Sequence, residues 1–265
     1  MNEAILGGLI AGGTDPADIV ATVRRAERAA ELAERHAGIT AIAGEEEPEN
    51  NVQAATGADV VILGVKPVGT AALAREISGA LSPDTLVVSV AAAVSLEQLE
   101  AALPPGQPVI RTMPNTPARL GRGVVSVSGG THCSAEQLQQ AKDIFAAVGT
   151  VVEIPESQVD ALSAVSGSGP AYAFYLAEAM AAAGVELGLD PELSKLLARE
   201  TVAGAGLMLA EPGADPTALR IAVTSPNGTT ERAIATFDEQ GLPGIIAAGA
   251  RAASERAAQI TKQLG

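Results

Sequence analysis

Short apolar runs recur along the first half of the chain, and helical patterns separate them. The runs occupy residues 18–21, 59–65, 85–90, 108–111, 123–127 and 150–154. The helical patterns occupy residues 69–80, 95–103 and 134–148. Continuous apolar strands that alternate with helices are typical of a parallel sheet that is covered on both faces. We therefore predict an α/β, Rossmann-like dinucleotide-binding domain over residues 1–154.

The second half of the chain has no further strand pattern. Helical patterns occupy residues 170–187, 191–210 and 243–263, and two shorter ones follow Pro216 and Ser225. Proline favours the first turn of a helix, and Pro170, Pro191 and Pro243 stand at such starts. We therefore predict an all-helical second domain over residues 155–265.

Composition limits the classes of function. The chain has 265 residues and a formal net charge of −14, which argues against a nucleic-acid partner and against an anionic membrane surface. The single cysteine excludes an internal disulfide, and one cysteine with two histidines makes a metal site unfavourable. The apolar run at residues 4–11 is too short to span a bilayer and has no basic segment before it. We expect a cytoplasmic protein that acts on a small molecule.

The opening of the first domain departs from the usual pattern. A dinucleotide-binding domain normally begins with a strand, a glycine-rich turn and a helix. Here residues 1–10 already have the pattern of that helix, so Gly7 and Gly8 are no phosphate loop, and Gly12 and Gly13 end the helix. We expect that the first strand and its glycine turn, roughly ten residues, are missing. The alternative is a variant fold that needs no first strand.

The end of the second expected strand bears on cofactor preference. An NAD site usually has an acidic residue there, whereas this chain has Thr22, Val23, Arg24 and Arg25. A hydroxyl and two guanidinium groups suit the 2′-phosphate of NADP. In the alternative interpretation, both arginines lie at a solvated helix start and pair with nearby glutamates. We predict NADP, with NAD as the second possibility.

Five motifs follow one another in the order found in one enzyme family. They are residues 64–67 (GVKP), 89–92 (SVAA), 111–117 (RTMPNTP), 166–172 (SGSGPAY) and 224–230 (TSPNGTT). In these motifs the chain resembles the pyrroline-5-carboxylate reductases from Met1 to about Thr261. The resemblance implies an oxidoreductase that reduces 1-pyrroline-5-carboxylate to L-proline with NAD(P)H, the last step of proline biosynthesis. It also implies a homodimer or higher homo-oligomer through the helical domain, with a site shared between subunits.

The resemblance also implies the residues of the site. Contacts to the nicotinamide and pyrophosphate would come from Met1, Val65, Lys66, Pro67, Ala91 and Ala92. Contacts to the adenosine would come from Thr22, Val23, Arg24 and Asn51. Contacts to the substrate would come from Glu156, Ser225, Asn227, Gly228, Thr229 and Thr230. Two departures stand out: the family's glycine loop is absent, and Asn227 stands where a second glycine is frequent, a change that asparagine tolerates.

The chemistry needs little from the protein besides placement. An imine nitrogen is basic and can arrive protonated, so no strong general acid is required. Thr230 is the predicted catalytic residue, because its hydroxyl can hydrogen-bond the ring nitrogen. Backbone N–H groups of residues 227–230 open a helix and suit a carboxylate. A plain helix cap is the alternative for 224–230, and a tight turn before a long helix is the alternative for 166–172. Tyr172, Phe174 and Tyr175 are expected in the core.

Two rival functions remain open at this point. A hydroxy-acid dehydrogenase of similar two-domain architecture would need a lysine as proton donor, and Lys195 is the mid-domain candidate, although its helix position indicates a surface residue. The other rival is a truncated, non-catalytic, oligomeric protein that binds metabolites. The first predicts activity on hydroxy acids, and the second predicts no cofactor binding.

Overall fold

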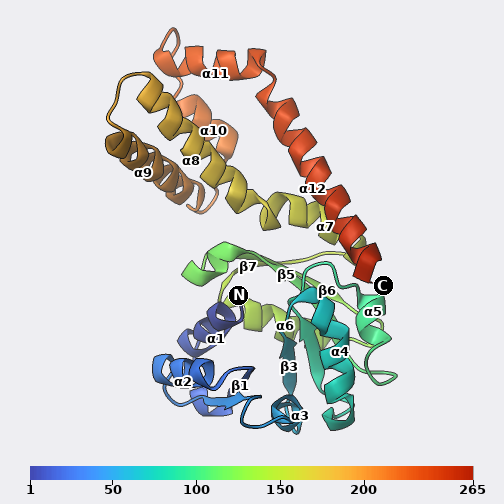
Figure 1. Cartoon of the computed structure of the whole chain (residues 1–265). Helices are drawn as coiled ribbons and strands as arrows, with labels where there is room; N and C mark the ends of the chain where they lie inside the picture. The colour runs from blue at the N-terminus through green and yellow to red at the C-terminus, as the bar shows by residue number, and fades with distance from the viewer. Residues whose placement is uncertain (265) are drawn as a thin grey trace. The chain divides into compact units, whose positions relative to one another are not determined.

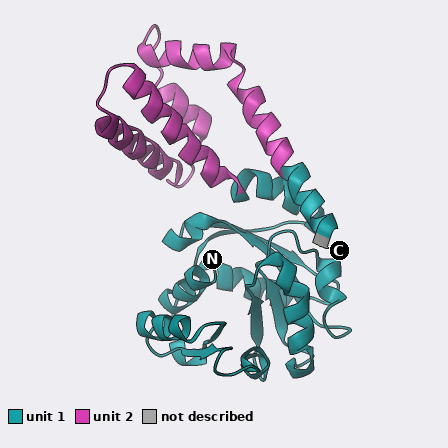
Figure 2. Cartoon of the chain, viewed as in Figure 1, with its two compact units in different colours: residues 1–167, 254–265 teal, residues 168–253 magenta. Residues whose placement is uncertain are grey.

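The chain folds into two compact units, shown in two colours in Figure 2. The structure is a computed structural model, and it describes residues 1–264. Unit 1 consists of Met1–Gly167 together with the end of the chain from Ser254, and unit 2 is Ser168–Ala253. The division into compact units places residues 155–167 with unit 1. The predicted domain boundary after residue 154 remains a prediction.

Unit 1 contains two sheets and the helices that connect their strands (Figure 1). The strands are β1 (Val20–Val23), β2 (Thr40–Ala43), β3 (Val60–Leu63), β4 (Leu86–Ser89), β5 (Val109–Pro114), β6 (Gly123–Gly129) and β7 (Gly149–Glu153). The α-helices are α1 (Asn2–Ala11), α2 (Ala26–Arg35), α3 (Asn50–Ala55), α4 (Pro67–Ile77), α5 (Leu96–Glu100), α6 (Ala135–Ala146) and α7 (Val159–Leu162). Strands β1 and β2 form one sheet, and β3 to β7 form the other in sequence order.

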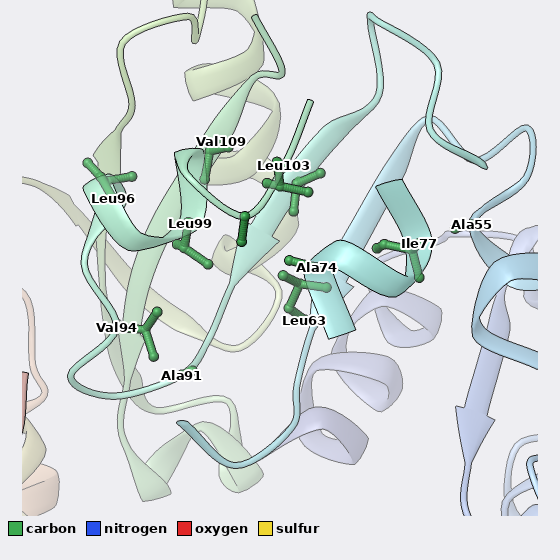
Figure 3. Close-up of a cluster of buried hydrophobic side chains, with 12 residues drawn as sticks. Ala55, Leu63, Ala74, Ile77, Ala91, Val94, Leu96, Leu99, Leu103 and Val109 are labelled. Carbon is green, nitrogen blue, oxygen red and sulfur yellow. The ribbon is translucent and has the colours of Figure 1, made fainter. Parts of the chain in front are cut away.

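The five-stranded sheet is covered on both faces, as the apolar runs predict. Alternate residues of β4 point to opposite faces, so Val87 belongs to one core and Val88 to the other. The first core includes Ala74 and Ile77 of α4 and Leu99 of α5 (Figure 3). The second core joins Ile5 of α1 to Ala141 and Phe145 of α6. The predicted α/β fold is thereby confirmed.

One pairing in this sheet departs from the prediction. The sequence predicts a wholly parallel sheet, but β6 runs antiparallel to β5, with Ile110 opposite Gly129. Only a short 3₁₀ turn, Thr116–Leu120, separates the two strands. A parallel crossover needs a dozen or more residues, so this connection allows only a reversal of direction. The remaining pairs are parallel.

The two-stranded sheet was only partly anticipated. The sequence predicts a strand at residues 18–21, whereas β1 extends to Val23 and begins at Val20. Strand β2 and helix α3 were missed, because four residues and six residues give too short a pattern to stand out. The side chain of Asn50 joins the two strands, donating from Nδ2 to the carbonyls of Val23 (3.2 Å) and Ile42 (3.1 Å).

A gap separates the two sheets between β1 and β3. Each of these strands pairs on one side only, β1 with β2 and β3 with β4, among the residues that the structure describes. A cavity of about 690 Å³ lies between the two unpaired edges, and residues of β1, β3 and α1 line it. The apolar side chain of Val20 is 44 % exposed there. Within residues 1–264 the first element is α1, in agreement with the helical pattern of residues 1–10.

Unit 2 is helical, as predicted. It contains α8 (Gly169–Glu186), α9 (Pro191–Leu209), α10 (Pro216–Ala222), α11 (Thr229–Glu239) and the first part of α12 (Leu242–Leu264). Helices α8 and α9 pack closely, and the hydroxyl of Ser194 donates to the carbonyl of Ala181 at 2.6 Å. The prediction that the aromatic residues of α8 lie in the core is wrong for the single chain: Phe174 is 69 % and Tyr175 71 % exposed.

Candidate active site

The carboxyl ends of β3 and β4 carry two of the predicted cofactor segments. After β3, Gly64 and Val65 lead to Lys66, which has extended backbone angles and stands just before the first turn of α4 at Pro67. After β4, the loop of residues 90–94 leads to α5, and it carries Ala91 and Ala92. Ligands of open α/β sheets bind outside the carboxyl ends of parallel strands. The fold therefore brings these two segments to the edge where a dinucleotide would bind.

The start of α1 is fixed at the same edge of the sheet. The side-chain amide of Asn2 donates to the carbonyl of Gly64 at 2.7 Å. A Cβ atom at position 64 would overlap the Asn2 amide, so a larger residue there would displace the Asn2 side chain from this hydrogen bond. Met1 stands before the first turn of α1, and its carbonyl accepts hydrogen bonds from the N–H groups of Ala4 and Ile5. This contact of Asn2 was not predicted from the sequence.

The cavity between β1 and β3 gathers the predicted adenosine contacts. Thr22, Val23, Arg24 and Asn51 all line it, and so does Val65 after β3. The predicted residues Met1, Lys66, Pro67, Ala91 and Ala92 do not line this cavity. The cavity thus holds the Thr22 hydroxyl, the Arg24 guanidinium and the amide of Asn51, which donates to the carboxylate of Glu76 at 3.0 Å.

The arginines after β1 have different surroundings. Arg24 lines the cavity, whereas Arg25 lies 3.7 Å from the carboxylate of Glu27. The alternative interpretation, in which the arginines pair with nearby glutamates, therefore applies to Arg25 and not to Arg24. The side chain of Arg25 is 59 % exposed, so this ion pair holds it only weakly.

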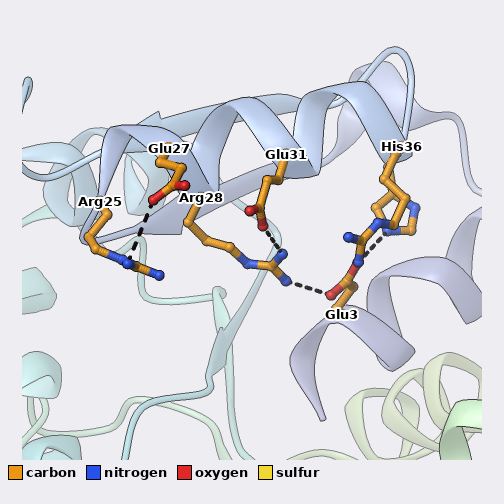
Figure 4. Close-up of polar contacts among 7 residues, drawn as sticks. Glu3, Arg25, Glu27, Arg28, Glu31 and His36 are labelled. Carbon is orange, nitrogen blue, oxygen red and sulfur yellow. Dashed lines mark hydrogen bonds and ion pairs between the residues drawn. The ribbon is translucent and has the colours of Figure 1, made fainter.

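An ion-pair network connects α1 to α2 beside this cavity (Figure 4). The carboxylate of Glu3 accepts hydrogen bonds from Arg28 at 2.5 Å and from Arg35, and its Oε1 lies 3.4 Å from His36. Arg28 also donates to Glu31 at 2.7 Å. The hydrogen bond from Arg28, with help from Arg35 and His36, lowers the pKa of Glu3 to about 2 although partial burial opposes the shift.

Glu156, predicted as a substrate contact, has two partners inside unit 1. Its Oε1 accepts hydrogen bonds from the guanidinium of Arg111 (2.8 Å) and from the backbone N–H of Leu96 (2.7 Å). The Arg111 side chain is only 6 % exposed. The role of Arg111 was missed, although a charged residue in an otherwise apolar predicted strand is a signal for a buried ion pair.

The predicted substrate segment forms the start of α11 in unit 2. Asn227 has a φ of 57°, the left-handed conformation that asparagine tolerates, and Gly228 precedes the first turn. Two of the N–H groups expected to bind a carboxylate already have acceptors. The N–H of Asn227 donates to the Glu231 carboxylate at 2.8 Å, and that of Gly228 donates to the Ser225 carbonyl at 3.0 Å. The first-turn N–H groups of Thr229 and Thr230 have no acceptor within the helix.

Comparison with known proteins gives the family. A model of the pyrroline-5-carboxylate reductase dimerisation domain matches residues 156–260, and a model described as NADP oxidoreductase, coenzyme F420-dependent, matches residues 1–93. The pyrroline-5-carboxylate reductase of Corynebacterium melassecola is 42 % identical, over 99 % of this chain and 96 % of its own length. The chain belongs to the pyrroline-5-carboxylate reductase family. The reductase of Pseudomonas aeruginosa is 41 % identical over 100 % of this chain and 95 % of its own length.

Solved structures agree with this assignment. The structure of a pyrroline-5-carboxylate reductase from Coxiella burnetii superposes with a TM-score of 0.89 at 34 % identity, covering 98 % of this chain and 94 % of that one. The pyrroline carboxylate reductase of Plasmodium falciparum, solved with NADP bound, shares the fold with a TM-score of 0.80 at 23 % identity, covering 98 % and 94 %. The prediction of a truncated chain has no support from these alignments.

The family fixes the reaction. The chain is a pyrroline-5-carboxylate reductase of proline biosynthesis, an NAD(P)H-dependent oxidoreductase, and its dimerisation domain makes it a homo-oligomer. The two rival functions are thereby set aside. Lys195, the proton donor that a hydroxy-acid dehydrogenase would need, has a side chain that is 68 % exposed and pairs with Glu192 at 2.8 Å. No helix among residues 1–264 is both long and apolar enough to cross a membrane.

Proposed function

We propose that the cofactor is NADPH and that its 2′-phosphate is bound beside Thr22 and Arg24. What supports this is the cavity between β1 and β3, which both residues line together with Asn51. A guanidinium and a hydroxyl donate to phosphate oxygens, and no acidic side chain follows directly after β1 to bind a ribose diol instead. Residues 65–67 and 91–92, at the carboxyl ends of β3 and β4, bind the nicotinamide and the pyrophosphate. Met1, next to Asn2 at the start of α1, contributes to the same contacts.

The substrate segment acts mainly by placement. When bound, the dihydronicotinamide supplies a hydride to the imine carbon of pyrroline-5-carboxylate. The π electrons of the C=N bond then move to the nitrogen. The nitrogen carries a proton, either on arrival or by transfer within the site, and the product is the ring amine of proline. Thr230 hydrogen-bonds this nitrogen through its hydroxyl, and the N–H groups of Thr229 and Thr230 hold the substrate carboxylate. Ser225, Asn227 and Gly228 shape the turn that presents them. Glu156, for which the resemblance implies a substrate contact, accepts hydrogen bonds from Arg111 and from the N–H of Leu96 in unit 1.

Homo-oligomerisation takes place through unit 2, and a dimer is the smallest assembly. Its exposed large apolar side chains include Phe174, Tyr175, Leu187, Leu207, Ile221 and Ile245. Many large apolar side chains exposed on one helical unit are unfavourable in water and favour burial against a second copy. Light scattering tests this, and a monomer at micromolar concentration would contradict it. We propose the cytoplasm as the compartment, from the composition and the net charge of −14.

The decisive experiment is a direct assay. The purified chain is mixed with NADPH and pyrroline-5-carboxylate, and oxidation of the cofactor is followed by absorbance while proline is measured as the product. A preference for NADPH, with stoichiometric proline, is the expected result. Oxidation of NADH alone would contradict the proposed role of Arg24, and cofactor oxidation without proline would contradict the proposed reaction.

A further inference from the structure

The loop of residues 90–94, between β4 and α5, has an unusual backbone. Ala93 has a φ of 60°, although it is not a glycine, and its side chain is buried. A left-handed conformation is unfavourable for alanine, so it persists only where the surrounding structure holds it in place. Such positions gather where a ligand is bound. The conformation of Ala93 therefore depends on the side chains that hold this loop.

Hydrogen bonds fix the loop where it leaves β4. The hydroxyl of Thr112 on β5 donates to the carbonyl of Ser89 at 2.9 Å. The hydroxyl oxygen of Ser89 in turn accepts a hydrogen bond from the N–H of Ala91 at 3.3 Å. All three residues are buried, so these bonds are shielded from water. The first half of the loop is thus attached to the two central strands β4 and β5.

A second set of hydrogen bonds fixes the loop where it enters α5. Ser95 and Gln98 form a capping box: Ser95 Oγ accepts from the N–H of Gln98 at 3.2 Å, and Gln98 Oε1 accepts from the N–H of Ser95 at 2.9 Å. The next N–H, that of Leu96, donates to Glu156 Oε1 at 2.7 Å. The first turn of α5 therefore depends on a carboxylate from a distant part of the chain.

Glu156 is itself held by Arg111. The same Oε1 atom accepts from the Arg111 guanidinium at 2.8 Å, so one oxygen connects β5, the first turn of α5 and the 3₁₀ turn Glu156–Gln158. A buried guanidinium without a partner is strongly unfavourable, so the ion pair is maintained in the folded chain. Because Oε1 already accepts two hydrogen bonds, its orientation is set by the protein and not by a substrate.

We propose that Arg111 and Glu156 are positioning residues for the loop of residues 90–94. Glu156 holds the first turn of α5, and this keeps Ala91 to Ala93 in the conformation that the cofactor meets at the carboxyl end of β4. The inference rests on the proposed function only in that Ala91 and Ala92 border the cofactor. It replaces the direct substrate contact that the resemblance implies for Glu156.

Two substitutions at one position test this assignment. Glu156→Gln keeps an oxygen that can accept from Leu96 N–H but removes the charge, and Glu156→Ala removes both interactions. We expect the Kd for NADPH, measured by calorimetry without substrate, to rise about threefold in Glu156→Gln and about tenfold in Glu156→Ala. The KM for pyrroline-5-carboxylate at saturating NADPH should stay within about twofold of the wild-type value.

Hydrogen exchange gives a readout that does not depend on turnover. In the free protein, the amides of residues 91–96 should exchange about tenfold faster in Glu156→Ala than in the wild type, because the loop loses one of its two anchors. Glu153→Gln is the matched control, because it removes an ion pair of the same unit, with Lys142, away from this loop. It should change neither exchange at residues 91–96 nor the Kd for NADPH.

Two outcomes would overturn the assignment. A raised KM for pyrroline-5-carboxylate with an unchanged Kd for NADPH would show that Glu156 contacts the substrate. Unchanged exchange at residues 91–96 in both variants would show that the loop does not depend on it. If Glu156→Ala fails to fold, Glu156→Gln decides by the same measurements. A wild-type chain that binds NADPH but makes no proline would contradict the proposed function and leave this test intact.

Discussion

Gly8 in α1 lies against Val148, the residue just before β7, with no space for a methyl group between them. A Cβ atom at position 8 would lie 2.5 Å from Val148 Cγ1 and 2.9 Å from the carbonyl oxygen of Ala147. A Cβ at the neighbouring Gly7 would meet only the His36 ring, at an ordinary contact distance of 3.5 Å. Of these two adjacent glycines, only Gly8 is required by close packing.

Alanine substitutions at these two positions should therefore have opposite effects. Gly8→Ala should destabilise the fold by about 1–3 kcal/mol, because the backbone of α1 has to move away from residues 147 and 148. Gly7→Ala should stabilise it by about 0.5–1 kcal/mol, because alanine favours the helix interior. Urea unfolding of both variants measures the difference, and equal effects would contradict the packing described for α1.

The ion pairs of Glu3 predict a dependence of stability on pH. The pKa of Glu3 is lowered to about 2 in the folded chain from an ordinary value of 4.5, so the carboxylate stabilises the fold fully above pH 4.5. This contribution is lost as the pH falls from about 4.5 through about 2. Glu3→Gln should cost about 1–2 kcal/mol at pH 7, and the difference from the wild type should shrink towards zero near pH 2.

Urea unfolding at several pH values between 7 and 2.5 measures this difference. Glu27→Gln is the matched control, because the Glu27 side chain is 76 % exposed and its carboxylate lies 3.7 Å from Arg25. It should have no measurable effect at any of these pH values. A difference between Glu3→Gln and the wild type that stays constant with pH would show that packing, and not charge, is responsible.

Thr230→Ala tests the proposed catalytic hydroxyl. We expect kcat/KM for pyrroline-5-carboxylate to fall about 10- to 100-fold, because the ring nitrogen loses its hydrogen-bond partner. The Kd for NADPH should change less than about twofold. Thr236→Ala is the control on the same helix, because its hydroxyl only donates to the Arg232 carbonyl. Full activity of Thr230→Ala would remove this hydroxyl from the mechanism.

The two arginines after β1 should differ in their effect on the cofactor. Arg24→Ala should raise the KM for NADPH about tenfold and leave the KM for NADH nearly unchanged, because only NADPH carries the 2′-phosphate. Arg25→Ala should have a smaller effect, because Arg25 lies beside Glu27 and does not line the cavity. Steady-state kinetics with both cofactors decide this. Equal loss for NADPH and NADH would contradict phosphate recognition by Arg24.

The sequence predicts the fold where its patterns are long and local. The apolar run before Gly64 gives β3, and the proline at position 191 correctly starts α9. The direction of β6 was missed, because it depends on the length of one turn and not on the strand's own residues. The exposure of Phe174 was missed for another reason: hydrophobicity indicates that a side chain is buried somewhere, and not whether its own chain or another copy covers it.

The candidate site was predictable in its residue types more than in its contacts. Thr22 and Arg24 were identified from their place after a strand, and they do line one cavity. The partners of Glu156 could not be foreseen, because Arg111 and Leu96 lie 45 and 60 residues away in the sequence. Contacts over such distances are set by strand order and helix packing, which no local pattern records.

The separation of the two sheets has a consequence for how the molecule opens. No strand-to-strand hydrogen bond connects β1 and β2 to the five-stranded sheet within the described residues, and their own core is small, centred on Leu6, Leu32 and Ile39. A region with few buried apolar contacts unfolds locally at a lower free energy than the rest. The part of unit 1 that contains β1 and β2 should therefore behave as a separate foldon. In hydrogen exchange, the amides of β1 and β2 should lose protection well before those of β4 and β5. Occupation by NADPH would raise that local free energy and join the two foldons into one cooperative unit.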